Sequence, residues 1–558
     1  MTWSQVYDPF GNIWLSSLVA AVPVLVLLGA IGIFEIKAHI AALLGLVTAL
    51  VIAVVAFGMP PGAAAMAAVY GAGFGLMPIG WIILNVIFLY QLTNEKGEFD
   101  VLRHSIRGIS DDRRMQVLFI AFSFGAFIEG SAGFGAPVAI SAAFLVGLGF
   151  RPFQAAVLCL IANTAPVAWG AIGTPIKTLA GVTKLDVEAL SACSGRILPP
   201  LSMIVPIWLV VVMVGWRATL PVWPALLVVG GTFAGVQFAW SNFVGVDLVD
   251  IVSAVASLVA GVVLLKFWRP REEWRFPEER EATTGGPFPS EPYHPLARGQ
   301  VLRAWTPFAL LSATVLIWGL PPVKKFMDDH TSWNTPMPGL HGKVAKGPEV
   351  LPAGALPEKH LEDAKLPIVP VSSTGTAVFV AALLSGLFLG VSPSRLVAMF
   401  GQTVRRLVPA MVTIFAMLAL GFLTRYAGTD AVLGLAFTRV GRDLYPIFGA
   451  LLGWLGVALT GSDTASNVLF GNLQVVTATK LNLDPVLMAS ANTTGGVMGK
   501  MIDAQSIVVA AAATGEGGKE GDILRTVLWH SIVLALLVGL IVWVYAIVLP
   551  GWVPSSLL

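Results

Sequence analysis

Several apolar runs in this 558-residue chain are long enough to cross a lipid bilayer as helices. Clear examples are residues 13–34, 40–57, 248–265 and 527–549. Counting similar runs predicts about 12 to 14 transmembrane helices. Only 12% of the residues are charged, whereas soluble domains contain about a quarter. The chain is therefore predicted to be an all-α polytopic membrane protein that forms a single transmembrane domain over residues 1–558.

The remaining composition argues against a cleaved leader and against a metal centre. The run 13–34 is too long for a signal-peptide core and no basic segment precedes it, so no cleavage is expected. Cys159 and Cys193 are the two cysteines, and the seven histidines are scattered. Neither a disulfide framework nor a cysteine metal site is expected, and no cofactor is predicted.

Basic residues predict the orientation in the membrane. They gather in residues 95–114, in a loop at 268–303 and around Arg395, Arg405 and Arg406. The positive-inside rule places these regions in the cytoplasm and both termini outside. The polar insert 321–372 would then be external. Its lack of apolar periodicity predicts an irregular loop, with a small recognition cap as the alternative.

Short identities recur at a nearly constant offset along the chain. Leu92-Thr93 matches Leu423-Thr424, Gly130-Ser131 matches Gly461-Ser462, and Ala162-Asn163-Thr164 matches Ala491-Asn492-Thr493. Their common order predicts two repeats, at about residues 38–180 and 374–512.

Charge predicts that the two repeats cross the membrane in opposite directions. Residues 99–114 are basic and amphipathic, as in a helix on the cytoplasmic surface, whereas the equivalent 430–444 is mostly apolar apart from Arg439 and Arg442. Inverted repeats of this kind are typical of secondary transporters, whose substrate site lies between the repeats.

The first repeat is interrupted twice by glycine and proline. Residues 129–137 contain three glycines and a proline, which a regular helix interior does not accommodate. A re-entrant hairpin here, and a broken helix at 163–175, would direct backbone N–H groups towards an anion. The alternative is a proline kink in a structural helix. The substrate-binding candidates are Gly130, Ser131, Gly133, Gly135, Asn163 and Thr164.

The second repeat adds charged residues to the same pattern. Lys500 is the first candidate for binding a substrate carboxylate, with Asp463 or Asp503 as its partner in the empty state. Alternatively, Lys500 extends to the membrane interface. Glu129, Asp463 and Asp503 are the candidates for proton coupling. The other substrate-binding candidates are Gly461, Ser462, Asn467, Asn492, Thr493, Thr494 and Gln505. The alternative for the glycines and hydroxyls is close helix packing.

Common catalytic signatures are missing from the sequence. The chain has no His-Glu-x-x-His, no Gly-x-Ser-x-Gly around Ser131, and no Walker A motif at Gly499-Lys500. The chain is therefore not expected to be an enzyme or to use ATP.

The interrupted segments resemble those of the bacterial L-lactate permease family. The resemblance rests on Glu129-Gly130-Ser131-Ala132-Gly133-Phe134-Gly135-Ala136-Pro137, Leu160-Ile161-Ala162-Asn163-Thr164-Ala165-Pro166, Thr460-Gly461-Ser462-Asp463-Thr464, Ala491-Asn492-Thr493-Thr494-Gly495-Gly496-Val497 and Gly499-Lys500-Met501-Ile502. It implies proton-coupled uptake of L-lactate, and commonly of D-lactate and glycolate, across the bacterial inner membrane. One departure is Asp503-Ala504, where the family usually has Ser-Pro.

Proton-coupled symport of a small monocarboxylate by alternating access is thus the leading hypothesis, with protons and the lipid bilayer as the other partners and no nucleic acid. A sodium-coupled carboxylate carrier is the alternative within transport, because the Asn-Thr pairs and backbone carbonyls could coordinate Na⁺. A channel suits inverted repeats less well. A membrane enzyme is disfavoured by the missing catalytic residues.

Overall fold

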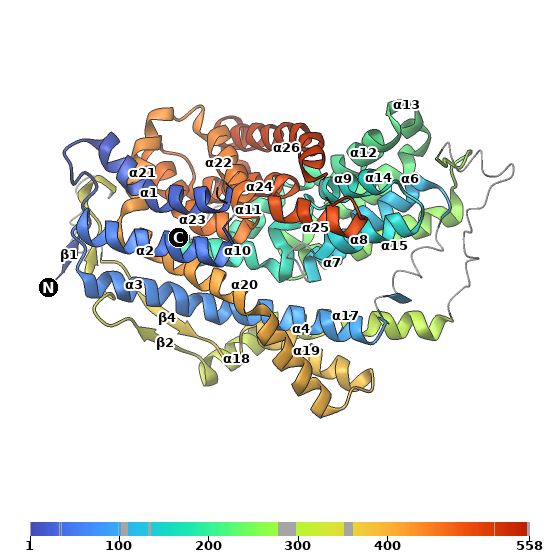
Figure 1. Ribbon diagram of the computed structural model, residues 1–558, viewed down its shortest axis with the longest axis horizontal. Coiled ribbons are helices and arrows are strands. Elements are labelled where there is room, and N and C mark those ends of the chain that lie inside the picture. The colour runs from blue at the N-terminus through green and yellow to red at the C-terminus, as the bar shows by residue number, and fades with distance from the viewer. Residues whose placement is uncertain are drawn as a thin grey trace.

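The protein is an elongated bundle of helices, many of which run along its long axis (Figure 1). The computed structural model describes residues 2–32, 34, 36–98, 100–101, 110–131, 136–276, 297–350, 361–517 and 519–554. Most of these residues are helical, which confirms the predicted all-α class.

Six described segments are long and apolar enough to cross a membrane: Pro61–Glu95, Trp216–Phe243, Val249–Phe267, Arg298–Gly319, Pro393–Ala427 and Glu520–Val548. Two further pairs of helices qualify together but bend by 66° and 42° at a short break. Shorter apolar helices account for the other apolar runs, such as residues 13–34. A polytopic helical protein is confirmed, and the predicted 12 to 14 spans are reached only if these shorter helices also cross the membrane.

The chain up to the central basic loop forms the first group of elements. They are β1 (Trp3–Ser4), α1 (Ile13–Gly32), α2 (Ala38–Val55), α3 (Pro61–Phe74), η1 (Gly75–Gly80), α4 (Trp81–Glu95), α6 (Arg113–Gln116), η2 (Val117–Phe124), α7 (Gly125–Ser131), α8 (Ala136–Gly147), α9 (Pro152–Ala162), η3 (Val167–Trp169), α10 (Gly170–Thr183), α11 (Val187–Ile197), α12 (Pro199–Val214), α13 (Trp216–Thr219), η4 (Leu220–Val222), α14 (Trp223–Phe243) and α15 (Val249–Phe267).

The second group follows the basic loop. Its elements are α17 (Arg298–Gly319), α18 (Pro321–Thr331), β2 (Trp333–Pro336), β3 (Val344–Ala345), η5 (Pro348–Val350), β4 (Lys365–Ile368), α19 (Thr374–Phe388), α20 (Pro393–Ala427), α21 (Thr429–Phe437), η7 (Thr438–Val440), α22 (Tyr445–Thr460), α23 (Asp463–Lys480), α24 (Pro485–Gly499), η8 (Lys500–Ile502), α25 (Ala504–Thr514), α26 (Glu520–Trp543), η9 (Val544–Val548) and η10 (Pro550–Trp552).

Two 35-residue helical runs, α3 to α4 and α20, lie side by side and antiparallel. Arg395, at the start of α20, pairs with Glu95, at the end of α4, at 2.8 Å. At the other end of α20, the ring of Tyr426 lies 6.1 Å from that of Tyr70 on α3. Corresponding ends of the two runs therefore lie at opposite ends of the molecule.

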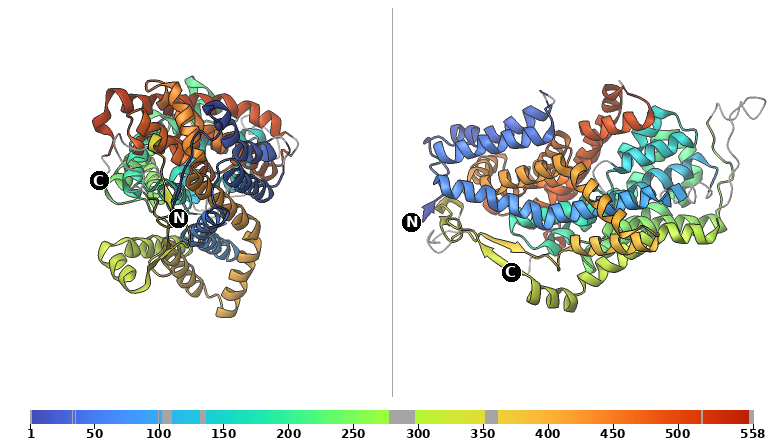
Figure 2. Two further views of the ribbon diagram at one scale, coloured as in Figure 1. Left: turned by 90° about the vertical axis from the view of Figure 1, so that its left-hand side faces the viewer. Right: turned by 60° about the horizontal axis from the view of Figure 1, so that its bottom comes forward.

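The packing of the interrupted segments is reciprocal. The helix after the break in the first half, α10, packs against α23 of the second half. The helix after the break in the second half, α25, packs against α8 of the first half. Likewise, α2 packs against α20 as α19 packs against α4. Seen along the long axis, α17 to α19 and the start of α20 lie below most of the other helices, beside α3 and α4 (Figure 2).

The insert 321–372 differs from the predicted irregular loop, because it contains α18 and three short strands. β1 of the N-terminal segment pairs in parallel with β3, and β2 pairs antiparallel with β4. Arg425, at the end of α20, forms an ion pair with Glu362 at 3.0 Å. The described part of the insert is thus folded, and an ion pair connects it to the end of α20. We call this insert the cap. Its partners lie far away in sequence, so periodicity within the insert could not reveal it.

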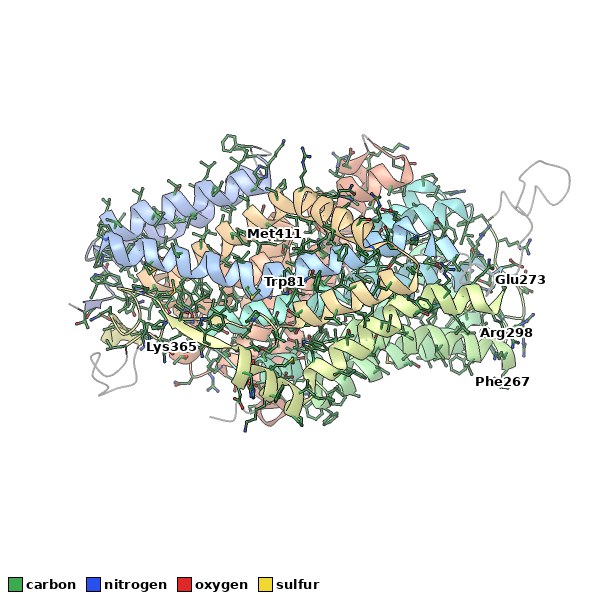
Figure 3. All side chains as sticks on the ribbon, turned by 90° about the horizontal axis from the view of Figure 1, so that it is seen from below. Trp81, Phe267, Glu273, Arg298, Lys365 and Met411 are labelled. Carbon is green, nitrogen blue, oxygen red and sulfur yellow. The ribbon has the colours of Figure 1, made fainter. Side chains whose placement is uncertain are left out.

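The two ends of the molecule carry different segments (Figure 3). Phe267 at the end of α15, Glu273 in the loop after it and Arg298 at the start of α17 lie at one end, and Lys365 of the cap lies towards the other. Residues 277–296 of the predicted loop 268–303, and most of the predicted surface helix 99–114, fall outside the described residues. Helix α17 begins at Arg298, inside the predicted loop 268–303.

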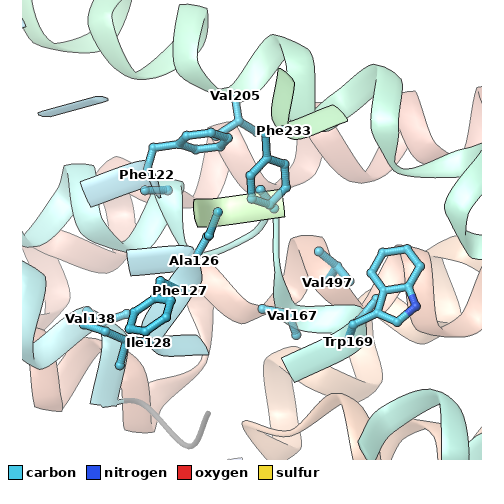
Figure 4. Close-up of a cluster of buried hydrophobic side chains, with 14 of the residues drawn as sticks. Phe122, Ala126, Phe127, Ile128, Val138, Val167, Trp169, Val205, Phe233 and Val497 are labelled. Carbon is cyan, nitrogen blue, oxygen red and sulfur yellow. The ribbon is translucent and has the colours of Figure 1, made fainter. Parts of the chain in front are cut away.

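Large apolar side chains are exposed along the outer helices, as in proteins that face lipid. Among them are Leu18 and Leu25 on α1, Val51 on α2 and Leu536 on α26. A separate apolar core surrounds the first interrupted segment, where Phe122 packs on Phe233 with ring centroids 5.0 Å apart (Figure 4). This core holds the polar breaks at a fixed place in an apolar surrounding.

Candidate substrate and coupling site

A cavity of about 330 Å³ lies where the interrupted segments of both halves meet α20. Five of the predicted site residues line it: Glu129, Gly461, Ser462, Asp463 and Lys500. Most of the remaining wall comes from α10, from the first turns of α23 and from one face of α20. A cavity of this size is at the small end of ligand pockets, which suits a small molecule.

Lys500 is buried beside this cavity, in the short helix η8 that follows α24. Its Nζ donates a hydrogen bond to the carbonyl of Gly461 at 2.7 Å and lies 3.1 Å from Oδ2 of Asp503. Of the two partners predicted for the empty state, the structure thus has Asp503. The side chain does not extend to the interface, because backbone and carboxylate acceptors hold it inside.

The start of α23 also faces the cavity. Gly461 ends α22 with φ of 73°, a left-handed conformation that glycine adopts without a steric penalty. Ser462 then caps α23, and its hydroxyl accepts a hydrogen bond from the N–H of Ala465 at 3.3 Å. A helix N-terminus favours negative charge through its dipole and free N–H groups. Lys500 and this helix end therefore offer a cation and backbone N–H groups to a carboxylate, with Asp463 and Asp503 as the acids beside them.

Asp463 is held by a polar network behind the cavity wall. Thr493 donates a hydrogen bond to its Oδ2. Asn467 donates to Thr493 Oγ1 at 3.0 Å, and Asn492 donates to Asn467 Oδ1 at 3.0 Å. Asn467 also donates to the carbonyl of Pro175 in the other half at 3.2 Å. These predicted site residues therefore position Asp463 and connect the two halves, and they do not line the cavity.

Glu129 is the acid that the first half contributes to the cavity. It lies on α7, is 4% exposed, and its Oε2 has no hydrogen-bond partner among the described residues. Gly170 of α10 lies so close that a Cβ there would be 2.7 Å from Glu129 Oε1. A side chain at position 170 would therefore have to displace the Glu129 carboxyl from its present position.

The predicted broken helix is present between α9 and α10. The two parts meet at 66°, and Ala171, Ile172 and Gly173 form a left-handed turn with φ of 44°, 58° and 71°. Such a conformation costs about 1–2 kcal/mol for each residue other than glycine. It directs the backbone of Gly170 to Pro175 into the cavity wall.

Other predicted site residues do not reach the cavity. The hydroxyls of Ser131, Thr164 and Thr494 donate to their own helices, at Phe127, Ile161 and Ser490 respectively. This is the structural alternative raised for such residues, because a hydroxyl in an apolar surrounding needs an acceptor.

The remaining predicted site residues are not among the described residues that line the cavity. Gly130 packs against Asp250, and Asn163 lies beside Glu129, outside the cavity lining. Gly133 and Gly135 lie outside the described residues, and Gln505 is at the start of α25. No role in substrate binding is assigned to these five residues.

The sequence reasoning missed the contribution of α20 and of two helices near it. Thr413, Met417 and Pro409 line the cavity from α20, joined by His39 of α2 and Ile83 of α4. Pro409 and Thr413 interrupt an apolar helix, and this pattern could have indicated a functional segment. Met417 and Ile83 are apolar residues in apolar helices, so nothing in the sequence indicated that they line a cavity.

The chain is similar to known proteins over nearly its whole length. A family model described as L-lactate permease matches residues 16–549. Glycolate permease GlcA of Escherichia coli K12 is 44% identical over 100% of both chains. The L-lactate permease of Bacillus subtilis is 44% identical over 97% of this chain and 98% of its own. Among solved structures, Neisseria gonorrhoeae MtrF, described as an efflux pump, gives a TM-score of 0.44 at 13% identity, covering 86% of this chain and 83% of its own. The chain belongs to the L-lactate permease family, whose members are transporters and not enzymes.

Proposed function

We propose that this protein takes up L-lactate, and also D-lactate and glycolate, together with protons across a bacterial inner membrane. The relatives named for lactate and glycolate transport support the substrate class. The observation that carries the proposal is Lys500, which is buried beside a cavity of about 330 Å³ and next to a helix N-terminus. A 2-hydroxy monocarboxylate needs one cation and a few hydrogen-bond donors in a compact space, and this corner supplies them.

We propose that substrate binding changes the contacts of Lys500. In the structure its Nζ contacts Asp503 and the Gly461 carbonyl. The substrate carboxylate replaces the contact with Asp503, and the Ser462 hydroxyl and the first N–H groups of α23 take the remaining oxygen atoms. Glu129, Asp463 and Asp503 are the acids available to carry the coupled proton.

Transport is proposed to proceed by alternating access between two inverted repeats, at about residues 38–180 and 374–512. The antiparallel runs α3 to α4 and α20, and the reciprocal packing of α10 on α23 and of α25 on α8, support this division. The cavity lies between elements of both repeats. Movement of one group of helices against the other would open it to each side in turn.

A sodium-coupled carrier is a second candidate, favoured by one observation. Oδ1 of Asp463 has no hydrogen-bond partner among the described residues, and the Thr493 hydroxyl contacts the other oxygen of the same carboxylate. Oxygen atoms of these kinds are suitable ligands for a hard cation.

Uptake into proteoliposomes distinguishes the two. Purified protein is reconstituted, labelled L-lactate is added outside, and either a pH gradient or a Na⁺ gradient is imposed with the membrane potential clamped by K⁺ and valinomycin. Acid outside should drive accumulation that a protonophore abolishes, and unlabelled D-lactate and glycolate should compete. Accumulation driven by Na⁺ and indifferent to pH would support the sodium carrier instead.

A further inference from the structure

Asp250 is a buried acid that the site described above does not use. It is the second residue of α15 and its exposed fraction is 0%. Neither of its carboxylate oxygens has a hydrogen-bond partner among the described residues. A carboxylate buried without a partner is too costly to remain charged, so such a group has to be neutralised. An ionisable residue inside a membrane segment is a functional candidate for this reason.

The first interrupted segment brings Asp250 close to Glu129. A Cβ placed on Gly130 would lie 2.9 Å from Cβ of Asp250 and 3.0 Å from the backbone N of Ile251. Glu129 is therefore the chain neighbour of the residue on which Asp250 packs. Oε2 of Glu129 also lacks a hydrogen-bond partner among the described residues. Only glycine at position 130 permits this approach.

The elements packed against α15 supply no counter-ion for Asp250. They are α14, η2, α7 and α10. The sequences of α14 and η2 contain no titratable side chain, and α7 contributes Glu129 alone. The single cation on α10, Lys177, pairs with Asp247 in the loop before α15. Asp250 thus faces another acid and no unpaired cation among these described elements, whereas Glu129 also shares its cavity with Lys500.

We propose that Asp250 and Glu129 form one proton-binding pair, in which Glu129 is the member at the cavity. Two carboxylates close together in a low dielectric cannot both ionise. The pair holds two protons when the monocarboxylate is bound and one when the site is empty. One proton therefore accompanies each anion, and the net charge moved is zero. This inference rests on the proposed function, since it assigns the coupled proton of that transport cycle.

The experiment compares Asp250→Asn with the wild type in proteoliposomes. Two readouts are measured: accumulation of L-lactate driven by a pH gradient, and exchange of labelled for unlabelled L-lactate at equal pH. The amide keeps the shape and mimics the protonated acid. We expect accumulation to fall by about tenfold or more and exchange to stay within about threefold of the wild type. The dependence of exchange on pH should also flatten. Glu95→Gln, which removes an acid from the exposed ion pair with Arg395, is the control and should retain both activities.

Accumulation by Asp250→Asn at the wild-type level would overturn the proposal, and so would equal loss of both activities in a folded protein. A wild type that does not respond to a pH gradient would instead refute the proposed function. If Asp250→Asn does not fold, Asp250→Glu keeps the acid but moves it by one methylene. A shifted pH profile of accumulation would then support the pair, and an unchanged profile would overturn it.

Discussion

Lys500 is both one member of a buried ion pair with Asp503 and the proposed contact of the substrate carboxylate. Removing one partner of a buried pair leaves the other charge unpaired, which costs about 3–5 kcal/mol. Lys500→Ala should therefore abolish uptake and also lower the melting temperature, since Asp503 is 0% exposed.

The double variant Lys500→Gln/Asp503→Asn separates these effects. It removes both charges, so thermal stability should recover towards the wild-type value while uptake stays absent. Measuring melting by intrinsic fluorescence and uptake in proteoliposomes checks both. Uptake by a folded double variant would exclude Lys500 from the site.

Glu129 differs from Lys500 because it lacks a partner for one oxygen and so has no ion pair to lose. Glu129→Gln should leave the protein folded and lower pH-driven accumulation by about tenfold, with a smaller effect on exchange. Glu95→Gln, in the exposed pair with Arg395, is the matched control and should transport normally. Equal loss of accumulation and exchange by Glu129→Gln would indicate a role in substrate binding instead.

The helices around the second interrupted segment depend on small residues where they touch. A Cβ on Gly453 of α22 would overlap the carbonyl of Asn492 in α24, and a Cβ on Gly495 would overlap that of Ala450. Close backbone approach through glycine replaces the hydrophobic driving force that is weak between helices in lipid. This contact holds α24, and thus Asn492 and Thr493, behind Asp463.

Gly453→Ala should accordingly lower thermal stability and uptake together, because α22 and α24 must move apart. Gly235→Ala in α14 is the control, since nothing lies within 4 Å of the added Cβ. Alanine is better than glycine in a helix by about 1 kcal/mol, so this variant should be at least as stable as the wild type. Both are measured by thermal unfolding in detergent. Normal stability of Gly453→Ala would show that the two helices can separate without cost.

At the scale of the whole molecule, the cap joins segments from across the sequence. Glu362 in the cap pairs with Arg425 at 3.0 Å and with Lys346 at 3.2 Å. Gln5 in the N-terminal segment donates to the carbonyl of Arg425 at 2.9 Å. Burial alone would raise the pKa of Glu362, but the charges of Arg425 and Lys346 lower it to about 2.

This shift predicts a dependence of stability on pH. Because the folded pKa of Glu362 lies below its usual value of 4.5, the stabilisation is complete above pH 4.5 and is lost as the pH falls towards 2. The wild type should thus melt at lower temperature as the pH drops through this window. Glu362→Gln should be less stable at pH 7 and should change less across the window. An identical pH profile in the variant would assign the acid sensitivity to other groups.

The sequence alone determined the class of this protein and the chemistry at its breaks. Runs of apolar residues have to satisfy their backbone hydrogen bonds internally in lipid, so helices follow from composition. Glycine, proline and charge inside such runs, as at Glu129, Asp463 and Lys500, are too costly to be accidental. Those residues were therefore found without a structure, and all three line the cavity.

Only the tertiary structure decided which polar residues face that cavity. Ser131 and Thr493 are equally polar in sequence, yet one hydroxyl bonds its own helix and the other bonds Asp463. The difference depends on which helices meet, and pairings such as α10 with α23 or Gln5 with Arg425 join residues far apart in sequence. Asp250 was visible as one acid in an apolar run. Its proposed pairing with Glu129 rests on the close approach of Gly130 to Asp250, which depends on how α7 and α15 pack in three dimensions.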